Sequence, residues 1–102
     1  MLTLSEIKTH LRIEQNEDAE NEYLNDLADA VHDYVQNYLN RDVPWKDEDG
    51  QDVPIPAGVK HAALLIIGDL YEHREAKFVG TIVTDNRAAD ALLHFHRVGI
   101  GI

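Results

Sequence analysis

Apolar residues recur at helical spacing from the start of the chain, and the first such stripe consists of Leu4, Ile7 and Leu11. Thr3 and Glu6 have the spacing of a capping box, with Thr3 as N-cap and Glu6 at position N3. The pattern predicts a short first helix over residues 4–11. Leu2 and Ile13 add to its apolar surface, so we expect this helix to dock on another element.

A longer apolar stripe predicts a second helix from about Ala19 to Asn40. Its members are Leu24, Leu27, Ala28, Val31, Val35, Tyr38 and Leu39. Either Asn16 or Asp18 is the expected N-cap. Four acids step by 4, 3 and 4 residues and so share the opposite face of this helix, namely Glu22, Asp26, Asp29 and Asp33. This acidic face is either an ordinary solvated surface or the lining of a DNA passage, and both interpretations stay open.

The third helix should begin near Pro56, which suits position N1, and reach about Ala76. Its buried face should consist of Val59, Ala62, Ala63, Ile66, Ile67 and Leu70. Leu64 and Leu65 widen this face until the helix is apolar nearly all round, so it needs either a central position or a neighbouring subunit. Gly68 costs the helix roughly 1 kcal/mol relative to Ala and indicates a close contact with another helix.

The helical pattern breaks twice. Residues 40–56 hold all three prolines and predict a hairpin or an irregular loop. Residues 78–86 have strand-like composition without a partner strand, and we interpret them as a loop, with ordering on assembly as an open alternative. A fourth helix should follow over residues 87–97, capped by Asp85 or Asn86. The side chains that we expect to point inward from it are Ala88, Ala91, Leu92 and Phe95.

Together these elements predict an all-α fold. It is a small bundle of about four helices, one short N-terminal, two long and one short C-terminal, with a proline-rich loop or hairpin between the second and third. The 102 residues suit one domain, here residues 1–102. The N-terminus lacks the basic segment of a signal peptide, and no apolar run approaches the ~20 residues that span a bilayer, so we expect no membrane association.

The net charge of -10 decides which partners are plausible. Binding to duplex DNA requires cations that neutralise phosphates, and this chain cannot supply a broad basic footprint. The chain also has no cysteine, which excludes disulfides, thiolate catalysis and cysteine zinc sites. We therefore expect a surface that keeps the chain soluble, or one that DNA must pass without sticking.

No residue pattern meets the requirements of a catalytic or metal site. An EF-hand with Gly50 at its sixth position would need acids where Trp45 and Pro56 stand. No two histidines have the i, i+4 spacing of a metal-binding helix. We therefore expect no enzyme activity, no cofactor and no bound metal.

Two pairs of acids resemble the magnesium ligands of all-helical nucleotide pyrophosphatases. They are Asp26 with Asp29, and Asp69 with Glu72. Asp26 and Asp29 belong to the polar face of their helix, so the geometry is poor. Because the spacing of the acids still matches, a metal-dependent nucleotide hydrolase remains one alternative function. A second alternative is an acidic inhibitor that mimics DNA by displaying carboxylates.

Three stretches, in this order and spacing, resemble a known family. They are residues 2–13, residues 55–75 with the sequence Leu70-Tyr-Glu-His-Arg-Glu75, and residues 91–97. The chain resembles the gp6-like head–tail connector family of tailed bacteriophages, also described as adaptor or DNA-packaging proteins. The resemblance covers nearly the whole chain.

The resemblance implies a structural virion protein of the head–tail junction, assembled in the host bacterial cytoplasm. It implies a ring, twelve-fold in the virion, that sits beneath the portal protein and extends the DNA channel. Its partners would be other copies of itself, the portal protein, the next connector, stopper or tail protein, and DNA that passes without specific binding. The resemblance implies no catalysis.

For such a ring, two sets of residues are candidates. The expected contacts with a neighbouring subunit or the portal are Leu2, Leu4, Ile7, Leu64, Leu65, Arg74, Ile82, Val98, Ile100 and Ile102. The tail residues among them, 98–102, could instead dock on their own domain. The expected channel-facing acids are Glu22, Asp26, Asp29 and Asp33.

Overall fold

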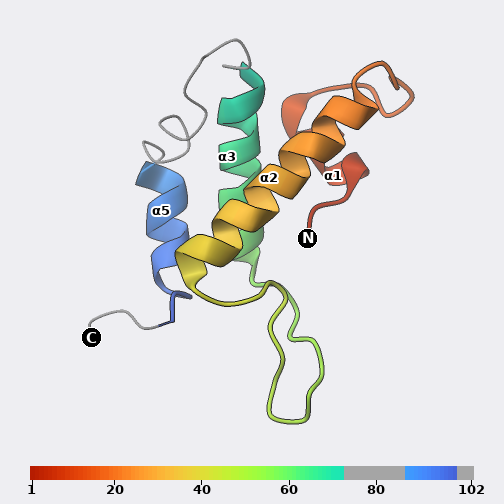
Figure 1. Cartoon of the computed structure of the whole chain (residues 1–102). Helices are drawn as coiled ribbons and strands as arrows, with labels where there is room; N and C mark the ends of the chain where they lie inside the picture. The colour runs from red at the N-terminus through yellow and green to blue at the C-terminus, as the bar shows by residue number, and fades with distance from the viewer. Residues whose placement is uncertain (73–86, 99–102) are drawn as a thin grey trace.

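The computed structural model describes residues 1–72 and 87–98 of the chain. This part contains the helices α1 (Leu4–Leu11), α2 (Asn21–Leu39), α3 (Ala57–Glu72) and α5 (Arg87–His94), which Figure 1 shows. Within these residues the only β-type pairing is an isolated antiparallel bridge between Lys46 and Asp52. The prediction of an all-α bundle is confirmed.

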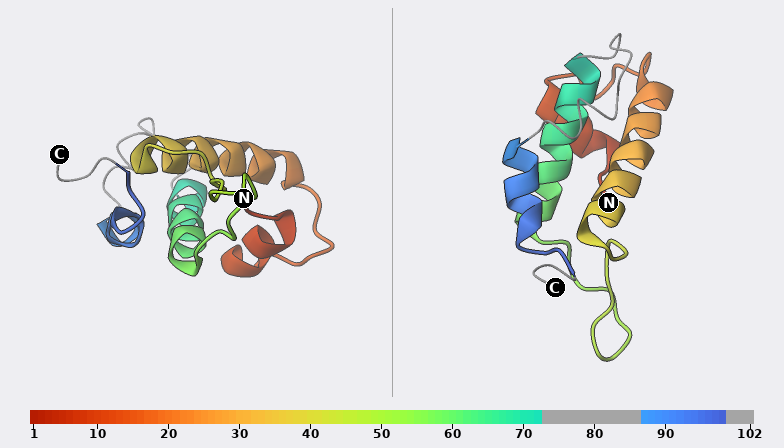
Figure 2. Two further views of the ribbon diagram at one scale, coloured as in Figure 1. Left: turned by 90° about the horizontal axis from the view of Figure 1, so that it is seen from below. Right: turned by 60° about the vertical axis from the view of Figure 1, so that its left-hand side comes forward.

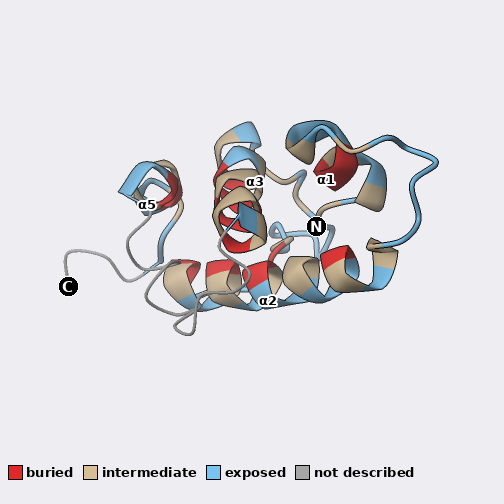
Figure 3. Cartoon of the chain, turned by 90° about the horizontal axis from the view of Figure 1, so that it is seen from above, coloured by how far each residue is buried: buried red, intermediate tan, exposed pale blue. Residues whose placement is uncertain are grey.

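The helices form two layers. α5, α3 and α1 lie side by side in one layer, and α2 crosses all three (Figures 2 and 3). α3 packs against each of the other three helices, which gives it the central position that its apolar surface requires. α1 and α5 therefore lie on opposite sides of α3, at opposite ends of the molecule. None of the helices in the described residues is long and apolar enough to cross a membrane.

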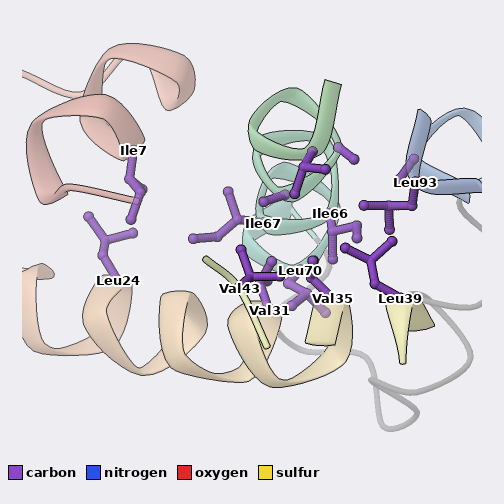
Figure 4. Close-up of a cluster of buried hydrophobic side chains, with 14 residues drawn as sticks. Ile7, Leu24, Val31, Val35, Leu39, Val43, Ile66, Ile67, Leu70 and Leu93 are labelled. Carbon is purple, nitrogen blue, oxygen red and sulfur yellow. The ribbon is translucent and has the colours of Figure 1, made fainter. Parts of the chain in front are cut away.

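The hydrophobic core lies where the two layers meet. α2 contributes Leu24, Val31, Val35 and Leu39, and α3 contributes all six residues of its predicted buried face. Ile7 from α1, Ala89 and Leu93 from α5, and Val43 from the segment after α2 complete it (Figure 4). The buried faces of α2 and α3 thus agree with the periodicity of the sequence.

The prediction for the inward face of α5 is wrong. Ala89 and Leu93 are fully buried, whereas Ala88 and Ala91 are exposed, Leu92 is only partly buried and Phe95 is 85% exposed. The reason lies in tertiary contacts, because the side chain and carbonyl of Asp90 accept hydrogen bonds from two tyrosines of α2. These bonds fix the rotation of α5 about its axis, and the helix also ends at His94, before Phe95.

The first helix begins as predicted. The Glu6 amide donates to the Thr3 hydroxyl at 3.1 Å, and the Thr3 amide donates to the Glu6 carboxylate at 2.9 Å, which is the predicted capping box. The second helix is present as predicted, but its expected N-cap, Asn16 or Asp18, is wrong: α2 begins at Asn21 with Glu20 as N-cap and no side-chain cap. Asp18 accepts hydrogen bonds from the side chains of Asn21 and Lys8 instead.

The ends of α3 and α5 follow the sequence only in part. α3 begins at Ala57, one residue after the expected Pro56. Its expected end at Ala76, the expected caps of α5 at Asp85 or Asn86, and the expected loop over 78–86 lie outside the described residues.

Residues 43–55 form a hairpin-like loop that projects from the bundle (Figure 1). The Val53 amide donates to the Trp45 carbonyl and the Asp47 amide donates to the Gln51 carbonyl, both at 2.8 Å. At the tip, the Asp47 carboxylate accepts hydrogen bonds from two backbone amides, and Gly50 adopts the positive φ of 79° that the turn requires. The Asp47 carboxylate therefore stabilises the turn itself.

Candidate assembly surfaces

The outer face of α2 carries the acidic row. All four acids, Glu22, Asp26, Asp29 and Asp33, are exposed, and α2 turns this side away from the layer of α1, α3 and α5 (Figure 3). None of the ion pairs among the described residues involves them. The row therefore presents carboxylates to whatever lies outside the two layers.

Four partly buried apolar candidates remain available for a contact between subunits, in addition to the exposed Val98. Leu2, Leu4, Leu64 and Leu65 pack against the core but are only partly buried. The central position of α3 thus covers much of the surface of Leu64 and Leu65 without enclosing it. One copy of the chain leaves part of this apolar surface in contact with water.

Ile7 requires a correction, because it belongs to the core and not to an outer surface. It is fully buried within the subunit and lies opposite Leu24 of α2 (Figure 4). We expected the apolar surface of the first helix to dock on another element, and this packing takes place within one chain. α1 contacts both α2 and α3.

Lys8 is a buried cation that the sequence did not reveal. It is 2% exposed, and its ammonium group donates to the Gln15 carbonyl at 3.0 Å and lies 3.4 Å from the Asp18 carboxylate. These contacts hold the segment that connects α1 to α2. A lysine on a short amphipathic helix is ordinarily exposed, so no sequence pattern would have indicated this role.

An ion pair and a close contact join α1 to α3. Lys60 lies 2.9 Å from the Glu6 carboxylate, and this contact, with the Thr3 amide, lowers the pKa of Glu6 to about 2. A Cβ atom on Gly68 would lie 3.4 Å from the His10 ring, as expected for a glycine at a helix contact. Beside it lies an open hollow of about 410 Å³, lined by His10, Leu11, Arg12, Gly68, Tyr71 and Glu72.

The end of the molecule beyond α5 exposes apolar surface. Phe95 and Val98 are the large hydrophobic side chains most exposed in the described residues, at 85% and 44%. Val98 is nevertheless anchored, since its amide donates to the Leu39 carbonyl at 2.8 Å. Nearby, the Arg41 guanidinium lies 3.9 Å from the centre of the Trp45 ring, so Trp45 covers the end of α2.

The remaining interface candidates, Arg74, Ile82, Ile100 and Ile102, lie outside the described residues. Within residues 1–72 and 87–98, no group of three or more histidines and acids is close enough to hold a metal ion. The exposed side of α2 carries Asp26 and Asp29 away from α3, so the paired acids do not face one another across a cleft.

Comparison with known proteins identifies the family of the chain. The model of the phage gp6-like head–tail connector protein family matches residues 1–94. The chain belongs to this family. A curated relative of this connector, the head completion protein gp6 of Enterobacteria phage HK97, is 35% identical over 88 residues, which cover 84% of this chain and 74% of the relative. No solved structure matches the chain.

As a gp6-like head–tail connector, the chain is a structural phage protein with a role in joining the head to the tail. A structural role agrees with the surfaces described above. They consist of a projecting loop, a row of exposed acids and partly covered apolar side chains. Phe95 is the surface residue that periodicity missed, because the sequence stripe containing it was assigned to the core.

Proposed function

We propose that the connector forms a closed ring, twelve-fold in the virion, that sits beneath the portal protein and extends the DNA channel. Membership of the family supports the location, and the incompletely covered Leu64 and Leu65 support contacts between subunits. A contact between two different surfaces closes into a ring when its rotation divides a full turn. The ring would then receive the next connector, stopper or tail protein on its other side.

The exposed acidic row on α2 is the observation that supports our proposal that α2 forms the wall of the DNA channel. Glu22 and Asp33 are the ends of this row, which extends roughly 16 Å at the helical rise of 1.5 Å per residue. DNA that passes within the Debye length of about 8 Å at physiological ionic strength would meet the negative field of this row. A repulsive wall lets the genome pass without being held.

This function involves no catalysis, no cofactor and no specific recognition of bases. The domain is proposed to comprise residues 1–102 and to assemble in the host cytoplasm before the tail joins. Portal and tail components would recognise the ring surfaces above and below the channel. The projecting loop at residues 43–55 stands out from the bundle and is one candidate for such a contact (Figure 1).

The ring is tested by adding the purified chain to portal-bearing heads and imaging the junction by electron microscopy. A twelve-fold density beneath the portal is the expected result. A chain that neither binds these heads nor associates with itself at high concentration would refute the ring. Stoichiometric binding of a monomer to a basic nucleic-acid enzyme would instead favour a DNA mimic.

The channel wall is tested by reversing two of its charges, with Asp26→Lys and Asp29→Lys in one variant. The matched control reverses two exposed acids outside α2 and outside the projecting loop, with Asp42→Lys and Glu72→Lys. We expect rings of the α2 variant to retain DNA and to slow genome ejection, more strongly at low salt. The control should eject normally. Equal ejection rates for wild type and both variants would exclude α2 from the channel wall.

A further inference from the structure

The side of α5 that faces away from the core has the character of a protein contact. Its residues are Arg87, Ala88, Ala91, His94 and Phe95, all exposed, and we call this set the α5 face. Phe95 supplies a large exposed ring, and the small side chains of Ala88 and Ala91 allow another chain to approach closely. Exposed aromatic side chains beside arginine are typical of the residues that dominate binding energy.

The α5 face lies at a basic end of a strongly acidic molecule. Residues 87–98 include Arg87 and Arg97 and a single acid, Asp90. The Asp90 carboxylate accepts a hydrogen bond from Tyr34 within the subunit, at 3.2 Å, on the side toward α2. Residues 87–98 therefore carry two guanidinium groups and one carboxylate. The Arg97 guanidinium lies 5.2 Å from the centre of the Tyr38 ring of its own copy, which leaves Arg87 as the cation of the α5 face.

The opposite end of the molecule has the complementary charge. Residues 13–20, which we call the acidic loop, contain four acids and no basic residue, although Arg12 precedes them. Glu14, Glu17 and Asp18 are exposed, and Ile13 is a partly exposed apolar residue beside them. A partly exposed apolar residue beside carboxylates is a suitable partner for an exposed Phe at the end of a helix face that carries Arg87.

These two surfaces are positioned for a head-to-tail contact. The acidic loop lies beyond α1 and the α5 face lies beyond the other side of α3, so the two are at opposite ends of the layer (Figures 1 and 3). A surface at one end cannot reach its complement on the same copy. It can reach the complement on the next copy, and repetition of that contact is what builds a cyclic assembly.

We infer that the α5 face of one copy docks on the acidic loop of the next copy, with Phe95 against Ile13. Arg87 then lies near Glu14 and Glu17 of the neighbouring copy, whereas the Arg97 guanidinium stays 5.2 Å from the centre of the Tyr38 ring of its own copy. The inference rests on the proposed ring and adds to it the pair of surfaces that forms each contact. It also explains why Phe95 is left outside the core of a single copy.

The first test compares Phe95→Asp with Asn25→Asp, which adds the same charge on the exposed side of α2. Occupancy on portal-bearing heads and self-association in solution are measured for both variants and for wild type. We expect Phe95→Asp to weaken assembly by roughly tenfold or more, as for the loss of an interface anchor. Asn25→Asp should assemble like wild type.

The second test exchanges the charges. Arg87→Glu alone and the pair Glu14→Arg with Glu17→Arg should each weaken assembly. All three substitutions in one chain should restore it, because position 87 and the acidic loop then carry reversed but again complementary charges. Restoration distinguishes a head-to-tail contact from one in which two α5 faces pair with each other, since the latter would leave Arg87→Glu unrescued.

The outcomes separate this inference from the ring itself. If wild type assembles and Phe95→Asp assembles equally well, the ring stands and the α5 face is not its interface. If Phe95→Asp instead lowers the melting temperature of the monomer strongly, Phe95 is covered by its own chain and the inference is wrong. If wild type does not assemble on portal-bearing heads or in solution, the ring fails first.

Discussion

The hydroxyl group of Tyr34 donates a 3.2 Å hydrogen bond to the carboxylate of Asp90, which joins α2 to α5 across 56 positions of sequence. The Tyr38 hydroxyl donates to the carbonyl of the same residue at 3.4 Å. Two side chains one helical turn apart on α2 thus hold a single residue of α5. This arrangement fixes which side of α5 is buried and, as a consequence, leaves Phe95 outside.

Tyr34→Phe should lower the free energy of unfolding by about 1 kcal/mol, since it removes one partly buried hydrogen bond and leaves the ring in place. Tyr23→Phe is the matched control, because the Tyr23 hydroxyl makes no hydrogen bond among the described residues. Urea denaturation of both variants measures the difference. Equal stabilities would show that the Tyr34–Asp90 bond contributes nothing.

Ionisation of the Tyr34 hydroxyl should lower the stability of the protein at high pH. Burial, followed by the nearby Asp90 charge, raises the pKa of Tyr34 from 10.0 to about 12. The unfolded chain therefore releases this proton first, and the contribution of Tyr34 is complete below pH 10 and is lost as the pH rises toward 12. Denaturation between pH 9 and pH 12 should show a steeper decline for wild type than for Tyr34→Phe.

Glu6→Gln should reduce stability at neutral pH and have little effect in acid. The contact with Lys60 lowers the pKa of Glu6 from 4.5 to about 2, so its contribution is complete above pH 4.5 and is lost as the pH falls toward 2. Both side chains are about one-third exposed, and solvent screening keeps the effect below about 1 kcal/mol. Urea denaturation at pH 7 and at pH 2.5 measures it. A constant difference at both pH values would contradict the assignment.

The burial of α5 is tested by two truncations. Leu93→Ala should cost about 2–5 kcal/mol of unfolding free energy, because it removes a fully buried side chain and leaves a cavity. Phe95→Ala should change the stability of the isolated subunit by less than about 0.5 kcal/mol, since this ring is 85% exposed. Thermal unfolding below the concentration of assembly makes the comparison. The reverse ranking would support the pattern first expected from the sequence.

Substitutions at Gly68 test how closely α1 and α3 approach. Gly68→Ala should be tolerated or stabilise the protein by up to about 1 kcal/mol, because its Cβ atom would make an ordinary contact with the flexible His10 ring. Gly68→Ile should destabilise the protein by forcing His10 away. Adding His10→Ala to Gly68→Ile should recover part of that loss in denaturation experiments. No recovery would show that the larger side chain meets something other than His10.

The sequence was most informative where one hydrophobic periodicity was unambiguous. Val31 and Val35 on α2, and Ile66 and Ile67 on α3, are buried as their spacing predicts. The Thr3–Glu6 capping box was equally readable, because it depends only on residues three positions apart. Local rules therefore sufficed for the long helices and for the start of the first one.

Tertiary contacts decided the rest. On α5, two overlapping stripes both contain apolar residues, and the tyrosine contacts to Asp90 select the one with Ala89 and Leu93. Likewise, nothing in the spacing of α1 shows that Ile7 would be enclosed by its own chain. The candidate acids of α2 were placed on the correct side because the opposite side was plainly apolar.

The anchoring of Val98 has a mechanical consequence for the assembled particle. The Val98 amide is bonded to the Leu39 carbonyl, and an Arg41 guanidinium nitrogen lies 3.5 Å from the His96 carbonyl. A force on the chain beyond this point would reach the last turn of α2 through this hydrogen bond as well as α5 through the backbone. Tension would thereby be shared with the helix that carries the acidic row.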